Sequence, residues 1–347
     1  MSLKFIVKRT GKYLQFSHLS PIPGILILNN LSAWSDDLGI YCSIATDETF
    51  STKSIISSDG INWTITPGTI ASTDYSSMVW GAGKFVLLEK YGNNVLVSPD
   101  GTTWTTYSNI TSNEWSGLIW VSELNLFVAT GQNDTVMTSS DGIHWNTNTS
   151  ASGYIIDWYD VVWSDTLHLF FAIGATQEAS GYQNYAYSSD ATSWTTIDLG
   201  EYNALAVDWS HELGIFMMIC VDINTSDGFI FTSRDGIDWT LSNELGYTIV
   251  DAPSPGSNYT KLKWAPVFKS FILFFKDGTS PNIIMHYARS YDGVHVVYSP
   301  SPFDPSIYEQ PNSKFIYSNT LEQLLITTIS SVPPPLFLIG RNLPYSG

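Results

Sequence analysis

The residues of this chain best placed to do chemistry are aspartates that recur in one heptapeptide, Ser-x-Asp-Gly-x-x-Trp. Its six copies, two of them with one position changed, set these aspartates 41 to 57 residues apart. They are Asp59, Asp100, Asp141, Asp190, Asp235 and Asp292. A carboxylate could ligate a cation, but a cation needs several oxygen ligands and these turns are far apart. Because Gly permits positive φ and Asp accepts N–H bonds from its own loop, we interpret the aspartates as a structural turn motif.

A second candidate set is aromatic and lies in the segments that precede the repeated strands. Tyrosine and tryptophan dominate recognition surfaces, so these side chains are predicted ligand-binding residues. They are Tyr75, Trp115, Tyr154, Trp158, Tyr159, Tyr202, Tyr247 and Tyr259. Four of them stand five residues before a repeated Trp, so the position itself recurs. The structural alternative is a ring of aromatic side chains that caps a central channel.

No other residues form a recognisable catalytic or metal-binding pattern. Glycoside hydrolysis would need two carboxylates roughly 5–10 Å apart, and nothing in the sequence marks such a pair. The six histidines have no metal-ligand spacing, and no Gly-x-Ser-x-Gly elbow or phosphate-binding loop is present. We therefore predict no catalytic residue, no metal and no cofactor. The two cysteines, Cys42 and Cys220, lie in apolar runs and are predicted to be buried free thiols.

The elements that position these residues are hairpins. A second motif, Trp-Ser-x-x-Leu-x-x-aromatic, precedes each heptapeptide and occurs seven times in exact or looser form. The copies begin at Trp34, Trp80, Trp120, Trp163, Trp209, Trp264 and Tyr317. Each repeat holds four short apolar strands and no amphipathic helical stretch. This pattern predicts an all-β fold, a seven-bladed β-propeller of four-stranded antiparallel blades.

The repeat runs almost from end to end, which favours a single domain over residues 1–347. The seventh unit lacks its heptapeptide, and the first residues belong to no complete blade. We expect residues 1–20 to complete the last blade, so that N- and C-terminal strands close the ring and no sheet edge stays exposed.

These motifs resemble the BNR/Asp-box repeat proteins, whose sialidase-like propellers of viral or bacterial type carry Ser-x-Asp-x-Gly-x-x-Trp. Here Gly follows Asp directly, so the turn is one residue shorter. The resemblance implies a propeller, and its catalytic members are sialidases that clamp a carboxylate with three arginines. This chain has four arginines: Arg9, Arg234, Arg289 and Arg341. Two of them lie in or beside heptapeptides and the other two near the chain ends, so no such triad, and no sialidase activity, is expected.

The charge distribution excludes some partners. The net charge is −17, and no Lys or Arg occurs from Tyr91 to Ser233. Affinity for nucleic acid depends on cationic side chains, so we expect no nucleic-acid partner. The N-terminus has no apolar core of a signal peptide, and no run is long enough for membrane insertion.

Together these observations favour a non-catalytic binding or structural module that recognises a glycan or a protein partner. A virion, a phage particle or another extracellular surface is the expected setting. Two alternatives stay open: a glycan-active hydrolase on a propeller scaffold, and an assembly factor for a larger complex. The sequence does not specify the ligand or the oligomeric state.

Overall fold

The chain folds almost entirely into β-strands. The computed structural model describes residues 12–18, 22–71, 74–149, 156–176, 183–249, 260–277, 284–299, 310–311, 316–318, 320–329 and 337–344. Within these ranges the one helix is the three-residue 3-10 turn Pro266–Phe268, labelled η1. No helix in the described part of the chain is long and apolar enough to cross a membrane. The predicted all-β class is confirmed.

Six antiparallel sheets have four strands each, taken in chain order. The first contains β2 (Ile25–Ser35), β3 (Ile40–Asp47), β4 (Thr52–Ser57) and β5 (Thr64–Ile65). The second contains β6 (Tyr75–Gly81), β7 (Lys84–Glu89), β8 (Asn94–Ser98) and β9 (Thr105–Ser108). The third contains β10 (Trp115–Val121), β11 (Leu126–Gly131), β12 (Thr135–Ser139) and β13 (Asn146–Thr149). The fourth contains β14 (Ile156–Ser164), β15 (Leu169–Thr176), β16 (Gln183–Ser188) and β17 (Thr195–Asp198). The fifth contains β18 (Tyr202–Ser210), β19 (Ile215–Asp222), β20 (Asp227–Ser233) and β21 (Thr240–Thr248). The sixth contains β22 (Lys261–Ala265), β23 (Ser270–Asp277), β24 (Ile284–Ser290) and β25 (Val296–Ser299).

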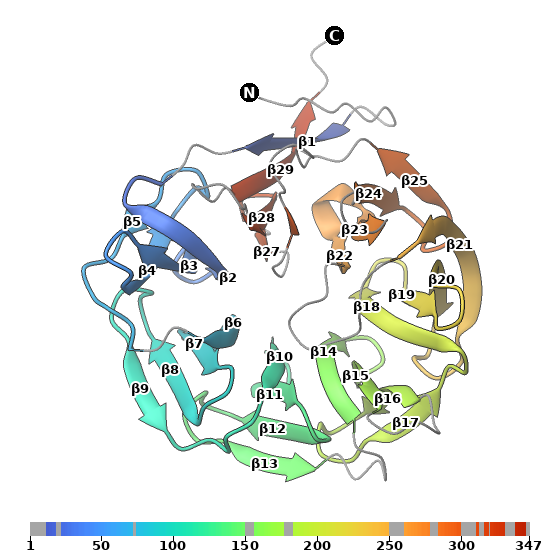
Figure 1. Cartoon of the computed structure of the whole chain (residues 1–347), viewed down its shortest axis with the longest axis horizontal. Helices are drawn as coiled ribbons and strands as arrows, with labels where there is room; N and C mark the ends of the chain where they lie inside the picture. Colours follow the sequence, from blue (N-terminus) through green and yellow to red (C-terminus); the bar gives the residue numbers. More distant parts are fainter. Residues whose placement is uncertain are drawn as a thin grey trace.

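The remaining strands join the two ends of the chain in one sheet. They are β1 (Lys12–His18), β26 (Gln310–Pro311), β27 (Ile316–Ser318), β28 (Gln323–Ile329) and β29 (Phe337–Pro344). β28 lies between β27 and β29, and β29 pairs in turn with β1, with Lys12 opposite Pro344 and His18 opposite Leu338. The first described strand therefore adds to the last one, at the outside of the molecule (Figure 1).

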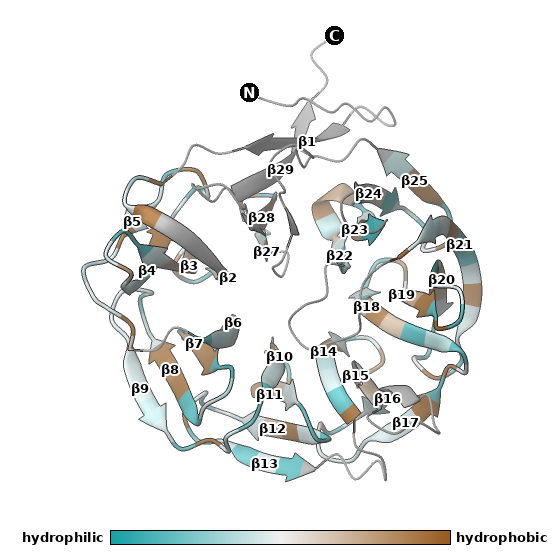
Figure 2. Cartoon of the chain, in the orientation of Figure 1, coloured by the Kyte–Doolittle hydropathy of each residue, from teal (hydrophilic) through white to brown (hydrophobic). Residues whose placement is uncertain are grey.

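The sheets are arranged around a common centre. In Figure 1 the first strand of each four-stranded sheet lies nearest the middle of the view, and the last strand lies at the periphery. The outermost strands β9 and β13 are mostly hydrophilic, whereas β8 is largely hydrophobic (Figure 2). This gradient follows burial, since only the inner strands are covered on both faces by neighbouring sheets.

The hydrophobic core lies between neighbouring sheets. One cluster joins Val86 and Leu88 of β7 to Leu118 of β10 and Phe127 of β11. The side chain of Phe127 is fully buried, and burying a side chain of this size contributes about 1.5–3 kcal/mol. Similar clusters occupy the other spaces between adjacent sheets. The rigid stack of sheets fixes the inner strands that surround the centre.

The Trp-Ser motif builds the hairpin between the first two strands of a sheet. Its Ser hydroxyl accepts the N–H of the residue three positions later, as in the bond from Leu38 N to Ser35 Oγ at 3.0 Å. The same bond recurs at Ser164, Ser210 and Ser318. Because successive strands are antiparallel, this hairpin and the heptapeptide turn between the third and fourth strands lie at the same end of each sheet.

Candidate functional site

A cavity of about 770 Å³ lies at the centre of the molecule. Its wall is built from the inner strands β2, β6, β10, β14, β18, β22 and β27. Residues from the beginning of these strands, such as Tyr75, and from their end, such as Trp80, both line it. The cavity therefore follows the inner strands along much of their length.

Each inner strand is the edge strand of its sheet. The backbone groups on its unpaired side therefore face the cavity. Side chains of the preceding sheet satisfy some of these groups. Ser77 Oγ donates to the carbonyl oxygen of Ser116 at 2.6 Å, and Ser116 Oγ donates to that of Trp158 at 2.5 Å. In the same sense of rotation, Asp208 accepts the N–H of Trp264 at 2.6 Å. Hydrogen bonds of this kind therefore join neighbouring inner strands around the wall.

Four inner strands share a single β-bulge near their start, whereas β2 has two register shifts. In those four strands the register shifts lie between Tyr75 and Ser77, Trp115 and Gly117, Trp158 and Asp160, and Ala204 and Ala206. The residue inserted at each shift lines the cavity in every case: Ser76, Ser116, Tyr159 and Leu205. A bulge re-aims a side chain that regular alternation would turn away. The same bulge therefore places a different side chain in the wall in each of these four strands.

The charged side chains of the wall gather mainly on β14, β18 and β22. Lys263 Nζ lies 3.0 Å from Asp208 Oδ1, and this carboxylate is buried whereas the Lys263 side chain stays 40% exposed. The other oxygen of Asp208 accepts the Trp264 N–H. Asp160 lines the cavity close enough to act electrostatically on Lys263. This group of Asp160, Asp208 and Lys263 is called the charged arc below.

The two partners of the buried ion pair have shifted pKa values. Burial raises the pKa of Asp208, although Lys263 and the Trp264 N–H oppose the effect. Burial lowers the pKa of Lys263, but the carboxylates of Asp208 and Asp160 outweigh it, and the net shift is upward. We therefore expect Lys263 to stay an ammonium group that is held in place by Asp208.

The wall also carries repeated tryptophans, and the Asp208 and Lys263 position directly precedes the repeated Trp. Trp80, Trp120 and Trp163 are half-buried and line the wall. Several of the repeated tryptophans also tie adjacent sheets together, because Nε1 donates to a carboxylate in the hairpin of the preceding sheet. These bonds are Trp80 to Asp37, Trp163 to Glu123, Trp209 to Asp165 and Trp264 to Glu212. We call them the tryptophan ties.

The structure does not bring the predicted ligand-binding aromatics together in one place. Tyr75, Trp115 and Tyr159 line the cavity. Trp115 and Trp158 are fully buried, so their rings are packed in the core and offer no face for stacking. Tyr202 packs against Phe229 and Phe231 between sheets, away from the cavity wall. Tyr154 and Tyr259 lie outside the described residues.

Tyr247 belongs to a separate aromatic cluster at the outside of the fifth and sixth sheets. Its ring centre lies 4.0 Å from that of His286, which also stacks on Phe275 at 5.1 Å. Tyr298 lies 5.2 Å from Tyr247, and its hydroxyl donates to the Leu245 carbonyl. Burial lowers the pKa of His286 despite the nearby Asp277. The cluster packs two sheets together, and none of these four aromatic side chains lines the cavity.

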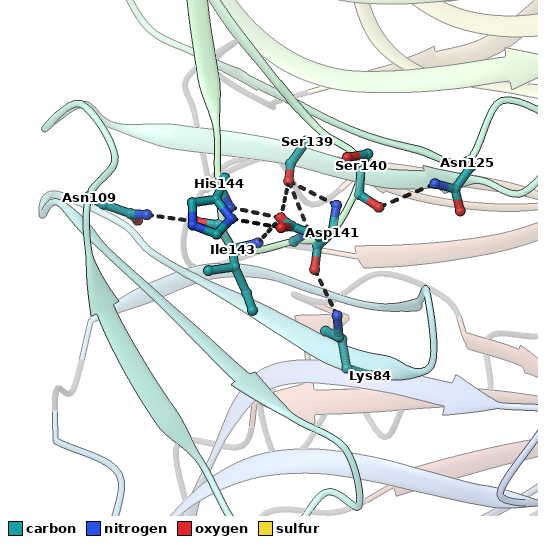
Figure 3. A network of polar contacts seen from close by, with 9 residues as sticks. Lys84, Asn109, Asn125, Ser139, Ser140, Asp141, Ile143 and His144 are labelled. Carbon is teal, nitrogen blue, oxygen red and sulfur yellow. Dashed lines mark hydrogen bonds and ion pairs between the residues drawn. The ribbon is translucent and has the colours of Figure 1, made fainter.

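The heptapeptide aspartates organise their own turns. In Figure 3, Asp141 Oδ1 accepts N–H bonds from Ile143 and His144, each at 2.8 Å, and the Ser139 hydroxyl at 3.0 Å. The same bonds recur at Asp59, Asp100, Asp190, Asp235 and Asp292. The Asp141 carbonyl also accepts Lys84 Nζ from the preceding sheet, at 2.9 Å. These carboxylates therefore act locally in folding.

The sequence contains one signal for the charged arc, at the position before the repeated Trp. The position before the repeated Trp holds Ala33, Val79, Ile119 and Val162 in the first four units. In the next two units it holds Asp208 and Lys263. Charged side chains at a position that is apolar in the other units are not explained by packing, so they indicate a functional site. Asp160, beside the bulged Tyr159, carried no comparable signal.

Other reactive groups are enclosed or dispersed. Cys42 and Cys220 are free and buried, as predicted, and burial raises the pKa of both thiols. Within the ranges that the structure describes, no three His, Cys, Asp or Glu side chains are placed to hold a metal ion. The cavity therefore remains the candidate site.

Comparison with known proteins supports the fold. No family model and no curated protein matches this sequence. Among solved structures, a streptogramin B lyase aligns with a TM-score of 0.62 and 10% identity, over 96% of this chain and 98% of that chain. A catalytically inactive virginiamycin B lyase variant from Staphylococcus aureus, with quinupristin, gives 0.62 and 8% identity, over 94% and 99%. The selenomethionine-substituted enzyme from the same organism gives 0.61 and 10%, over 96% and 100%.

These lyases are β-propellers, and so this chain has a β-propeller fold. At 8–10% identity the likeness extends to the fold alone. The resemblance to BNR/Asp-box proteins stays a prediction from the motifs.

Proposed function

We propose that this chain is a non-catalytic binding module that holds a glycan in the central cavity of its propeller. The observation that supports it most is the make-up of the wall, where half-buried aromatic rings and a charged arc face one space of about 770 Å³. Ligand cavities are typically about 300–1,000 Å³, with an apolar lining and few convergent polar groups. A sugar ring offers both an apolar C–H face and hydroxyl groups, which suits such a wall.

The proposed scaffold is a single seven-bladed ring over residues 1–347. Its support is the pairing of β1 with β29, which gives the terminal sheet an outermost strand from the beginning of the chain. The inner strand of that sheet, β27, contributes Ile316 and Tyr317 to the cavity wall. Closing the ring this way would remove exposed sheet edges.

The charged arc supports binding over hydrolysis. Both oxygens of Asp208 are engaged, one by Lys263 and one by the Trp264 N–H. A hydrolase needs two carboxylates that can each exchange a proton or attack the substrate. Asp208 is better suited to holding Lys263 in position. The charged arc therefore lacks the second carboxylate that Asp160 would need as a catalytic partner.

The proposed setting is a virion or another extracellular surface, with a glycan or a glycosylated protein as the partner. Its support comes from the sequence. The stretch from Tyr91 to Ser233 has no Lys or Arg and offers no site to proteases of tryptic specificity.

The proposal is tested by screening the full chain on an array of free and protein-linked glycans, followed by titration calorimetry of the glycans that bind. Tyr159→Ala removes the bulged aromatic of the wall, and we expect it to weaken binding about tenfold or more. Thr102→Ala, on a heptapeptide turn away from the cavity, is the control and should bind as the parent does. An array on which nothing binds would refute the proposal.

A second candidate is a glycan-active enzyme, favoured by the presence of both Asp160 and Asp208 in the cavity wall. Each bound glycan is therefore incubated with the protein and analysed by mass spectrometry. Cleavage of the glycan that Asp160→Asn abolishes would replace the binding proposal with this one.

A further inference from the structure

The charges of the cavity wall nearly cancel. Among the described residues, the wall contains four carboxylates and three ammonium groups: Asp36, Asp74, Asp160, Asp208, Lys90, Lys261 and Lys263. Ion pairs hold lysines of this wall in place. Lys263 lies 3.0 Å from Asp208, and Lys90 lies 3.2 Å from Glu114. The wall is therefore rich in charged groups but has almost no net charge.

This balance disfavours a charged ligand of either sign. An anion that approached Lys263 would lose its hydration and would lie beside both Asp160 and Asp208. A cation that approached Asp160 would meet the Lys263 ammonium group. In both cases repulsion offsets the attraction, and the cost of desolvating the ligand charge remains.

The same arc suits a neutral group that both donates and accepts hydrogen bonds. Lys263 supplies N–H donors, and one of them is already directed to Asp208. Asp160 supplies acceptors, and its Oδ1 takes one bond, from the N–H of Val161 at 3.0 Å. Of two hydroxyls on adjacent carbons, one can donate to Asp160 while the other accepts from Lys263, and hydrogen bonds to charged partners are the stronger ones.

An aromatic surface lies on the same strand as Asp160. Tyr159 is placed in the wall by the bulge, and Trp163 lies half-buried at the far end of β14. The C–H face of a sugar is apolar and can cover such a ring, while its hydroxyls reach the charged arc.

We infer that the ligand is a neutral saccharide that places two adjacent hydroxyls between Asp160 and Lys263, and that acidic sugars are excluded. This inference rests on the proposed binding function, and it adds the class of glycan. The charged arc then selects the ligand by charge balance, and the acidic surface of the chain reinforces the exclusion of anions.

The test compares matched neutral and acidic saccharides on the full-length protein by titration calorimetry. Pairs that differ by one acidic group, such as lactose and sialyllactose or glucosides and glucuronides, are measured at about 0.05 M and about 0.5 M NaCl. We expect the neutral member of each pair to bind at least about tenfold more tightly. Its affinity should stay within about twofold between the two salt concentrations, since a neutral ligand makes no ion pair for salt to screen.

Asp160→Asn tests the arc itself. The amide keeps the shape but weakens the acceptor, so we expect about tenfold weaker binding of the neutral saccharide. The matched control is Asp238→Asn on an exposed heptapeptide turn, which should leave affinity unchanged. Near-ultraviolet circular dichroism checks that both variants keep the native packing.

The outcomes separate the two proposals. If acidic saccharides bind more tightly, and lose affinity with salt, the inference is overturned while the binding function stands. Equal affinity of Asp160→Asn and the parent for the neutral saccharide also overturns it. If no saccharide of either class binds, the proposed function itself fails. The comparison of ligands uses the unaltered chain, so it holds even if a variant does not fold.

Discussion

At the scale of single residues, backbone N–H groups lower the pKa values of the recurring aspartates. Partial burial opposes the shift, but bonds from Asn62 and Ile61 lower the pKa of Asp59 to about 2. The pKa of Asp100 and that of Asp190 are also lowered to about 2, again against partial burial and by the N–H groups of their own turns. These groups favour the ionised carboxylate, so each turn is coupled to pH.

We predict that acid destabilises the protein most steeply between about pH 4 and pH 2. The folded pKa values lie below the unfolded value of about 3.9, so the unfolded chain binds more protons in this window. The contribution of the turns is therefore complete above about pH 4 and is lost as the pH falls through about 2. Asp208 acts in the opposite sense because burial raises its pKa, but it is one group against several.

Urea unfolding at a series of pH values measures this dependence. Asp59→Asn keeps the shape of the turn but removes one titrating group, and we expect it to cost about 1–2 kcal/mol at pH 7. The free-energy difference between this variant and the parent should shrink toward pH 2. A difference that stays constant over the whole range would contradict the assigned role of the carboxylate.

At the scale of the elements, neighbouring sheets are joined by more than hydrophobic contact. Each tryptophan tie connects an inner strand to the hairpin of the preceding sheet, and Trp264 donates to Glu212 at 2.6 Å. The second sheet has a shorter hairpin with no acidic residue. There Trp120 packs directly on Gly81, where an added Cβ would lie 2.4 Å from the indole. The chain therefore offers a comparison between Trp264, which forms a tie, and Trp120, which packs on glycine instead.

We predict that Trp264→Phe destabilises the protein by about 1–2 kcal/mol more than Trp120→Phe does. Phenylalanine keeps a ring in both places, but only the first change removes a donor to a carboxylate, a bond stronger than a neutral one. Thermal and urea unfolding of the two variants measure the difference. A double-mutant cycle with Glu212→Ala isolates the tie, and equal losses for both variants with no coupling energy would rule it out.

The sequence predicts the local elements of the fold better than it predicts the site. Hairpins, turns and inner strands follow from local motifs, since Ser35 and Asp59 bond within their own loops. The site is harder to predict. The recurring aromatic position predicted as a binding surface holds Trp115 and Trp158, which are buried, because a residue that every unit repeats serves the packing that every unit shares. The bulged Tyr159 and the charged arc depend on register and on contacts between sheets, which no single repeat encodes.

At the scale of the whole molecule, the proposed ring depends on the two ends of the chain. β1 pairs with β29 over seven residues, from Lys12 opposite Pro344 to His18 opposite Leu338. Without β1, β29 would become an exposed edge strand with unpaired backbone groups. The terminal sheet also contains β27. Loss of β1 would therefore loosen the wall of the cavity near Tyr317.

We predict that deletion of residues 1–18 lowers the stability of the full chain by about 3–5 kcal/mol, the net value of several backbone hydrogen bonds. The exposed edge should also promote self-association, detectable by light scattering. Deletion of residues 1–11 is the control, because it leaves β1 in place and should melt as the parent does. Addition of a synthetic peptide of residues 12–18 should restore part of the lost melting temperature. A protein without residues 1–18 that melts like the parent would show that β1 does not close the ring.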